Sequence, residues 1–132
     1  MKALTIKEPW ATLIIDGYKK YEFRSWKTNY RGKILIHAGM SKEKDMLEKF
    51  KDYNLNCSKG MIIGEAFLTD CILVTKEFEG ALLKIDKTVY GKPHEMKYAW
   101  KLENIIKYDE PIPIKGKLGL WNYEQESYPQ ES

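Results

Sequence analysis

One segment near the middle of the chain constrains the fold most. Residues 61–74, with the sequence MIIGEAFLTDCILV, are rich in β-forming side chains and predict one long strand. Gly64 lies inside this pattern, where a glycine indicates a β-bulge or the close approach of another backbone. A strand of this length in a chain of 132 residues favours a fold built around a sheet.

Shorter segments on both sides of this strand alternate between helical and extended patterns. Pro9 suits the first position of a helix and Gly17 suits the residue after its end, so we expect a helix over residues 9–16. This pattern predicts an α+β domain, in which a mixed sheet rolls into a small β-barrel with a few short helices packed around it. The other predicted elements are helices that begin at Ser41 and Thr75, strands at residues 21–25, 33–38, 98–106 and 118–123, and an extended segment with two prolines at 109–115.

Length and composition indicate one folded domain. A chain of 132 residues supports one hydrophobic core, and its 43% hydrophobic and 31% charged residues exclude a disordered composition. We assign the domain to residues 1–123 and expect the polar residues 124–132 to form a frayed tail. No apolar run reaches the ~20 residues that span a bilayer, and the N-terminus lacks an apolar stretch of signal-peptide length. We therefore expect a cytoplasmic protein without a membrane partner.

The cysteines and histidines form no metal-binding pattern. Cys57 and Cys71 are 14 residues apart, which is not a spacing typical of metal ligands, and the chain has only two histidines. We expect both cysteines to pack as small hydrophobic side chains. The sequence GKLG at residues 116–119 is too short for a phosphate loop and does not join a strand to a helix. We therefore expect neither a metal nor a cofactor.

The distribution of basic residues points to one segment. Of the 22 lysines and arginines, only Arg24 and Arg31 are arginines, and they lie close together. The planar guanidinium group forms paired hydrogen bonds with carboxylates, phosphates and base edges. The net charge of +3 permits contact with nucleic acid without requiring it. The two arginines indicate either a binding site or a structural ion pair.

Residues 17–26 hold the densest group of polar and aromatic side chains. Glu22 and Arg24 are two positions apart on a predicted strand, so their side chains share a face. This pair can read a base edge, hold a phosphate or form a salt bridge, and Lys19 adds positive charge beside it. Trp26 either stacks on a base, which is worth ~1–3 kcal/mol, or closes one end of the core. The residues alone do not separate these alternatives.

Several other ionisable side chains are candidates for catalysis. Glu8, Glu22, Glu65 and Glu103 can serve as acids or bases where burial shifts their pKa. His37 ends a predicted buried strand, where a single histidine is more often a hydrogen-bonded structural residue than a ligand or a base. The sequence shows no recognisable serine–histidine–aspartate or cysteine–histidine arrangement.

A series of motifs resembles one known family. The series spans nearly the whole chain, in order, and together the motifs resemble the ASCH domain family (activating signal cointegrator homology) of the PUA-like superfamily. The motifs are KEPWATLIIDG at residues 7–17, YEFRSW at 21–26, TNYRG at 28–32, ILIHA at 34–38, IIG at 62–64, YAWKLE at 98–103 and IPIKGKLGLW at 112–121. The resemblance implies a PUA-like β-barrel with a cleft between the barrel and the first helix.

The resemblance also implies a binding function. The cleft residues of the family correspond to Lys19, Glu22, Arg24, Ser25 and Trp26, and members are thought to bind RNA as regulators of translation or transcription. We therefore expect a module that binds RNA or a modified nucleoside, in which Glu22 and Arg24 read the base and Trp26 stacks on it. Lys19 and Arg31, the latter from the family's turn motif, would contact phosphate. A protein-interaction domain, with Glu22 and Arg24 as a structural ion pair, is another interpretation.

The alternative hypothesis is a hydrolase. One branch of small ASCH-like proteins is implicated in hydrolysing N4-acetylcytidine, with a lysine, a threonine two residues before the arginine, and a distant glutamate. Lys19 and Arg24 match this pattern, but Glu22 stands at the threonine position and removes the nucleophile of that branch. Glu22, beside Lys19, can instead act as a general base on water, with a modified nucleoside or RNA as substrate.

Overall fold

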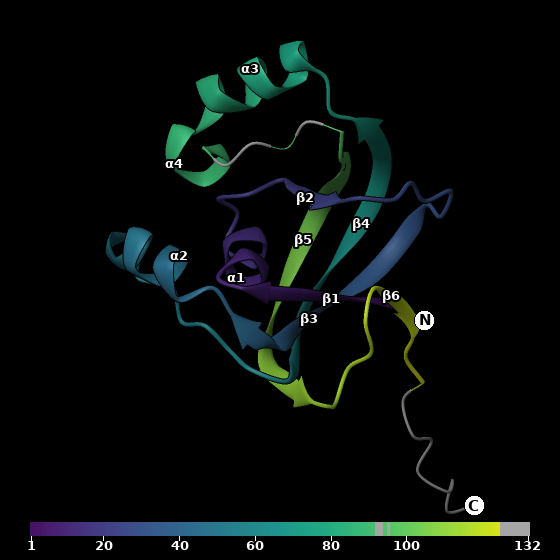
Figure 1. Cartoon of the computed structure of the whole chain (residues 1–132). Coiled ribbons are helices and arrows are strands. Elements are labelled where there is room, and N and C mark those ends of the chain that lie inside the picture. The colour runs from purple at the N-terminus through teal and green to yellow at the C-terminus, as the bar shows by residue number, and fades with distance from the viewer. Residues whose placement is uncertain (92–93, 95, 125–132) are drawn as a thin grey trace, which may run out of the picture.

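The computed structural model describes residues 1–91, 94 and 96–124 of the chain (Figure 1). In chain order the elements are β1 (Lys2–Glu8), α1 (Trp10–Ile15), β2 (Tyr21–Arg24), β3 (Gly32–Lys42), α2 (Lys44–Lys49), the 3-10 helix η1 (Lys51–Tyr53), β4 (Met61–Leu73), α3 (Lys76–Ile85), α4 (Lys87–Tyr90), β5 (Tyr98–Pro113) and β6 (Leu120–Asn122). Within these residues, no helix is long and apolar enough to cross a membrane. The tail predicted for residues 124–132 lies outside the described residues, apart from Glu124.

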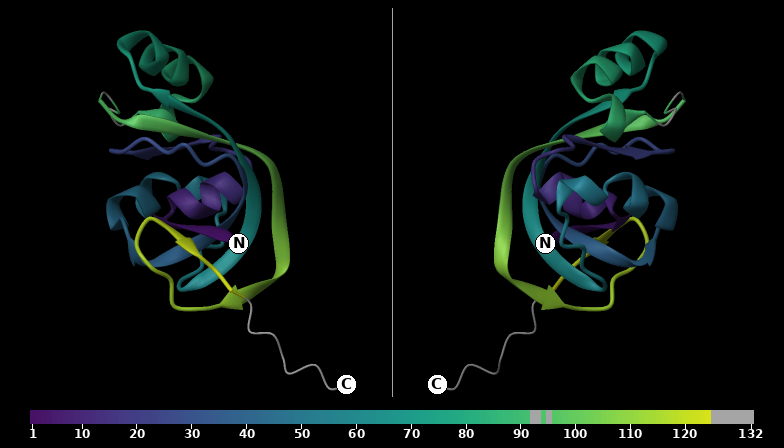
Figure 2. Two further views of the ribbon diagram at one scale, coloured as in Figure 1. Left: turned by 90° about the vertical axis from the view of Figure 1, so that its right-hand side faces the viewer. Right: turned by 90° about the vertical axis from the view of Figure 1, so that its left-hand side faces the viewer.

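All of these strands belong to one mixed sheet, in the order β2-β5-β4-β3-β1-β6. β1 and β3 run parallel, and the other neighbouring strands are antiparallel. The sheet curls around α1, because β4 and β5 bend strongly along their length (Figure 2). β2 and β6 form its two edges, so the sheet of the described residues is open. The predicted α+β class is confirmed, whereas closure of the sheet into a barrel is not confirmed.

Gly64 allows β4 and β5 to come close together. A Cβ atom at this position would collide with the carbonyl oxygen of Ile106 and would lie 2.7 Å from Cδ1 of Ile15. The pairing register between the two strands shifts next to Gly64. The long strand and the close approach predicted at this glycine are both confirmed, because only a residue without a side chain fits here.

The helix α1 fills the concave side of the sheet (Figure 2). Its residues 11–15 are all buried, and most of them pack against apolar side chains of the central strands. Gly17 follows this helix with a φ of +88°, as the sequence predicts, whereas Pro9, predicted at the first helical position, stands just before Trp10, where the helix begins. A second cluster joins α1 to the other helices beside the β2 edge, and its buried members are Leu13, Phe50, Leu82, Val89 and Tyr90.

Several elements differ from the sequence prediction. β5 extends to Pro113, so the strand predicted at 98–106 continues into the extended segment predicted at 109–115. The prediction lacks β1, whose pattern does not alternate because Ala3 and Leu4 are both buried. The helix α2 does not begin at Ser41, since that residue belongs to the end of β3. The sequence prediction also lacks the helix α4, which begins where the Asp86 carboxylate accepts hydrogen bonds from two N–H groups of its first turn.

The two ends of the described chain meet at the β1–β6 edge. The Met1 ammonium group donates a hydrogen bond to the carbonyl oxygen of Tyr123 at 3.1 Å. The Tyr123 N–H in turn donates to the Met1 carbonyl oxygen at 2.7 Å. β1 is thus paired with β3 on one side and with the last strand of the domain on the other.

Candidate functional site

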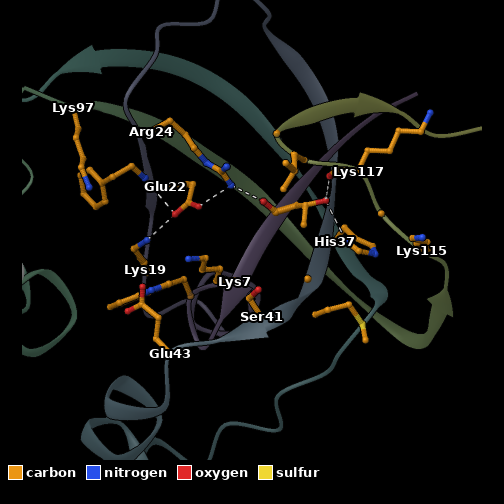
Figure 3. A pocket seen from close by; sticks show the side chains of 18 of the residues that line it. Lys7, Lys19, Glu22, Arg24, His37, Ser41, Glu43, Lys97, Lys115 and Lys117 are labelled. Carbon is orange, nitrogen blue, oxygen red and sulfur yellow. Dashed lines mark hydrogen bonds and ion pairs between the residues drawn. The ribbon is translucent and has the colours of Figure 1, made fainter.

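A cavity of about 490 Å³ lies between the edge strand β2, strands β1 and β3, and the loop that precedes β6 (Figure 3). This volume is within the ~300–1,000 Å³ typical of small-molecule sites. The lining residues come from distant parts of the sequence, including Thr5 of β1, Trp10 of α1, His37 of β3 and Gly119 of the loop. Tertiary folding therefore assembles the cavity from segments that are remote from one another in the chain.

Three charged side chains form an ion-pair network in the cavity wall. Lys19 Nζ lies 3.0 Å from Oε1 of Glu22, and Arg24 Nη2 lies 3.1 Å from Oε2 of the same carboxylate. Glu22 and Arg24 share one face of β2, as their spacing predicts. Lys19 is 4% exposed and Glu22 is 7% exposed, so water has little access to this pair. Because two cations face one carboxylate, the network carries a net positive charge.

Burial and charge act in opposite directions on the pKa values of this network. Burial tends to raise the pKa of Glu22, but the positive charges of Lys19 and Arg24 outweigh it and hold the pKa below its ordinary value. Burial lowers the pKa of Lys19, and the charge of Glu22 opposes this effect only in part. Glu22 is therefore an ionised acceptor at neutral pH and a weaker base than an ordinary glutamate.

Arg24 has hydrogen-bond donors to spare. Its Nη2 donates to the carbonyl oxygen of Thr5 at 2.6 Å and to Glu22 at 3.1 Å. Its buried Nε has no partner among the described residues. Lys19 donates to Glu22 and lies 4.9 Å from the ring centre of Trp10 and 5.1 Å from that of Phe23. The network is rich in donors, so a group that presents acceptors complements it.

Aromatic rings form the wall beside this network. Phe23 and His94 stack with their ring centres 3.7 Å apart. His94 Nδ1 lies 3.2 Å from Oε1 of Glu79, which fixes the imidazole ring, while burial lowers the pKa of His94. Both rings line the cavity, so the stacked pair contributes aromatic surface to its wall.

The loop that precedes β6 forms the opposite wall. His37 is held at both ring nitrogens, 2.7 Å from the carbonyl oxygen of Ile114 and 3.3 Å from Oγ1 of Thr5. Thr5 Oγ1 also donates to the carbonyl oxygen of Lys117 at 2.6 Å. A Cβ atom at Gly116 would lie 2.5 Å from Nδ1 of His37, so the loop backbone passes directly over this histidine. His37 is thus a hydrogen-bonded structural residue that fixes the loop.

Lysines dominate the rim of the cavity. Four lysines lie there, and within the described part of the chain none of them has an ion-pair partner. Among the described residues, the lining holds six lysine and arginine side chains, network included, and two carboxylates, so this part of the cavity attracts anions. The rim lysines are Lys7, Lys97, Lys115 and Lys117, and the carboxylates are Glu22 and Glu43.

The structure brings together three of the site residues expected from the sequence and leaves three others outside. Lys19, Glu22 and Arg24 line the cavity, while Ser25, Trp26 and Arg31 lie outside its lining. The rim lysines and His94 were not singled out in the sequence. Of these residues, only Lys115 and Lys117 have a sequence pattern that could have drawn attention to them, which is a pair of lysines on either side of a glycine.

Trp26 packs within the protein and is also partly exposed. Its ring meets that of Trp100 edge-on, with 4.7 Å between the centres, and it remains 41% exposed. Its carbonyl oxygen accepts a hydrogen bond from Nε1 of Trp100 at 3.4 Å. Trp26 therefore helps to cover the core, and its exposed part is outside the cavity.

Arg31 stabilises the turn before β3. Its Nη1 donates to the carbonyl oxygens of Thr28 and Tyr30 at 3.0 and 2.8 Å. Its Nη2 lies 3.9 Å from a carboxylate oxygen of Asp70, in an exposed pair. These contacts give Arg31 a structural function in the turn.

The other candidate carboxylates lie outside the cavity lining. Glu8 is fully buried and accepts hydrogen bonds from Thr12 and from the N–H of Ser58. Glu65 accepts from Tyr108 at 2.9 Å and pairs with Lys33 at 3.0 Å. Glu103 forms an exposed pair with Lys101. Within the described ranges, no group of histidine, cysteine and acidic side chains has an arrangement suited to a metal ion.

Comparison with known proteins identifies the family. Residues 4–112 match the ASCH domain. The chain belongs to the ASCH domain family. Activating signal cointegrator 1 from Homo sapiens is 28% identical over 140 residues, and its Mus musculus counterpart is 26% identical over 133 residues. Both alignments cover 92% of this chain, which spans only 22% of the length of these relatives.

Solved ASCH structures share the fold. The crystal structure of ASCH from Zymomonas mobilis has a TM-score of 0.58 at 15% identity, covering 95% of this chain and 88% of that one. A mutant of the Zymomonas mobilis protein gives a TM-score of 0.56 at 15% identity, covering 95% of this chain and 90% of that one. The arrangement of one curled sheet with a few short helices is therefore the ASCH fold.

Proposed function

We propose that this ASCH domain is a binding module for RNA or a modified nucleoside, and that one base enters the cavity beside β2. The observation that carries the proposal is the donor-rich network of Lys19, Glu22 and Arg24 in a cavity of small-molecule size. The ASCH family as a whole is associated with RNA binding, which agrees with this assignment. A regulatory role in RNA metabolism or translation follows from the same association.

Each side chain of the network has a distinct task in this proposal. The Nη1 group of Arg24, for which we find no acceptor among the described residues, meets acceptors on the edge of the base, such as a ring nitrogen or a carbonyl oxygen. Glu22 Oε2 accepts one hydrogen bond, from Arg24, and can accept a second from an exocyclic amino group. The stacked Phe23 and His94 rings lie against the face of the base. Because Lys19 holds Glu22 Oε1, it fixes the orientation of the carboxylate.

Hydrolysis of a modified nucleoside such as N4-acetylcytidine, or of RNA, is the second candidate function. The observation that favours it is the lowered pKa of Lys19 inside the cavity, since a lysine with a lowered pKa is a better base and nucleophile. The lowered pKa of Glu22 opposes it, because this carboxylate is then a poor general base near neutral pH. Glu65 also has a lowered pKa and does not line the cavity. Because neither glutamate is suited to act as a general base in the cavity, binding is favoured over catalysis.

A tryptophan-fluorescence titration tests the proposal, because Trp10 lines the cavity. The ligands are short single-stranded RNA, cytidine and N4-acetylcytidine, and products are followed by chromatography. The variants are Arg24→Lys, which keeps the charge but removes the planar fork, and Arg31→Lys, the same change outside the cavity. We expect Arg24→Lys to weaken binding about tenfold, as for the loss of one paired contact worth ~1–3 kcal/mol.

The matched arginine variants separate the outcomes. Binding that survives Arg31→Lys but is weakened by Arg24→Lys supports the cavity as the site. Equal weakening of binding in both variants would indicate that the ligand lies along the whole segment from Lys19 to Arg31 rather than in the cavity. Turnover of N4-acetylcytidine or RNA that depends on Lys19 would favour the hydrolase. The absence of any binding to the wild-type domain would refute both functions.

A further inference from the structure

We propose that the ligand of this cavity carries a phosphate group, and that the loop of residues 115–119 holds this phosphate at the cavity mouth. The inference rests on the proposed function and narrows it, because a free nucleoside lacks the group that the loop would bind. The ligand would then be a nucleotide or a strand of RNA, with its base against the network of Lys19, Glu22 and Arg24.

The charges of the cavity are divided between two regions. Inside, Glu22 lies within 3.1 Å of both Lys19 and Arg24 and offsets one of their two positive charges. At the rim, the lysines have no ion-pair partner among the described residues. A polar but uncharged base suits the first region, whereas a phosphate dianion or diester suits the second.

The network and the two loop lysines are separate in space, whereas the rim lysine Lys97 lies on the side of the network (Figure 3). Figure 3 places Glu22 and Arg24 on one side of the cavity and Lys115 and Lys117 on the other. Lys7 lies between these groups, near the centre of the view. A ligand with a base at one end and a phosphate at the other can therefore contact both regions at once.

The backbone of the loop adds further anion-binding capacity. Gly116 lies against His37, where no side chain fits, and its neighbours Lys115 and Lys117 both line the cavity. Among the described residues we find no acceptor for the N–H groups of Gly116 and Lys117. Free backbone N–H groups together with lysine ammonium groups form the usual donor set of a phosphate site.

The loop is held in place before any ligand binds. Its carbonyl oxygens at Lys117 and Gly119 accept hydrogen bonds from Oγ1 and N–H of Thr5, at 2.6 and 3.2 Å. Nε1 of Trp121, in the middle of β6, donates to the same Oγ1 at 2.9 Å. Anchoring of this kind lowers the entropic cost of binding, because the loop does not have to become ordered when the ligand binds.

The test compares ligands that differ only in phosphate. Each of the four ribonucleosides, its 5′-monophosphate and a short single-stranded RNA are titrated by fluorescence at several salt concentrations. The variant is Lys115→Gln combined with Lys117→Gln. The control is Lys76→Gln combined with Lys84→Gln, which removes the same charge from exposed positions on α3 outside the cavity. Circular dichroism checks that both variants fold.

We expect at least one 5′-monophosphate to bind the wild-type domain about tenfold more tightly than its nucleoside. The loop variant should lose this preference, while the α3 control keeps it. For RNA, loss of this one phosphate contact should reduce the salt dependence, the slope of log K against log salt, by about 0.7.

Two further outcomes would overturn the inference in distinguishable ways. If a nucleoside binds as tightly as its monophosphate and the loop variant is unaffected, the loop holds no phosphate and the proposed base site stands. If the wild-type domain binds neither nucleoside nor nucleotide nor RNA, both the inference and the proposed function fail.

Discussion

Glu22 is the buried carboxylate that pairs with both Lys19 and Arg24. The substitution Glu22→Gln should therefore destabilise the fold strongly. Glutamine keeps the size of the side chain but removes the negative charge. Lys19 and Arg24 then remain as two positive charges without a counter-ion. The carboxamide also introduces an N–H₂ group that cannot accept from either of them.

The magnitude follows from the burial of the pair. Removal of one partner from a buried ion pair costs about 3–5 kcal/mol, because the other charge remains unpaired. The Arg24 side chain is 19% exposed, which gives it some access to water, so we take the lower end, about 3 kcal/mol. Against a total stability of about 5–15 kcal/mol for a typical domain, the variant should still fold.

The chain contains a matched control for this experiment. Lys101 and Glu103 are also 3.0 Å apart, but their side chains are 39% and 44% exposed. Exposed ion pairs contribute at most about 1 kcal/mol, so Glu103→Gln should leave the free energy of unfolding nearly unchanged. Urea unfolding monitored by circular dichroism should show a midpoint roughly 1–3 M lower for Glu22→Gln, with an unchanged slope. Equal effects of the two substitutions would refute the argument that the cavity network is shielded from water.

Two other predictions concern acid stability and backbone packing. Because the folded pKa of Glu22 lies below its ordinary value of 4.5, its stabilisation is fully present above about pH 4.5 and is lost as the pH falls through the folded pKa. The difference in unfolding free energy between wild type and Glu22→Gln should therefore shrink on acid titration, and a constant difference would contradict the assignment. Gly64→Ala should cost about 1–3 kcal/mol by collision with the Ile106 carbonyl group, measured by urea unfolding. Gly80→Ala on α3, where a Cβ atom meets open space, should instead gain up to about 1 kcal/mol, and a loss there as large as at Gly64 would contradict the steric argument.

The parts of the fold that were predictable are those with a local physical cause. The glycine at position 64 and the proline and glycine around α1 each determine backbone geometry by their own chemistry. β1 was not predictable, because it lies between β3 and β6 with buried side chains on both faces and so lacks an alternating pattern. The openness of the sheet depends on which strands pair at its edges, which no local pattern specifies.

The sequence could predict only those residues of the candidate site that lie close together in the chain. Glu22 and Arg24 share a face because they are two residues apart on one strand, and Lys19 is close in sequence. Lys97, Lys115 and Lys117 reach the same cavity only through the tertiary arrangement of β5, β6 and their loops. Trp26 illustrates the opposite case, since a sequence neighbour of Arg24 lies outside the cavity while the more distant Trp10 lines it.

The hydrogen bonds between Met1 and Tyr123 have an architectural consequence. Because entry to and exit from the domain lie at one point on the β1–β6 edge, the fold can be inserted between two segments of another polypeptide without separating them. A short linker could equally join the two ends and allow new termini in an exposed segment elsewhere in the chain. Such a circular permutant would keep β2 and the loop before β6 in place, so it would retain the cavity.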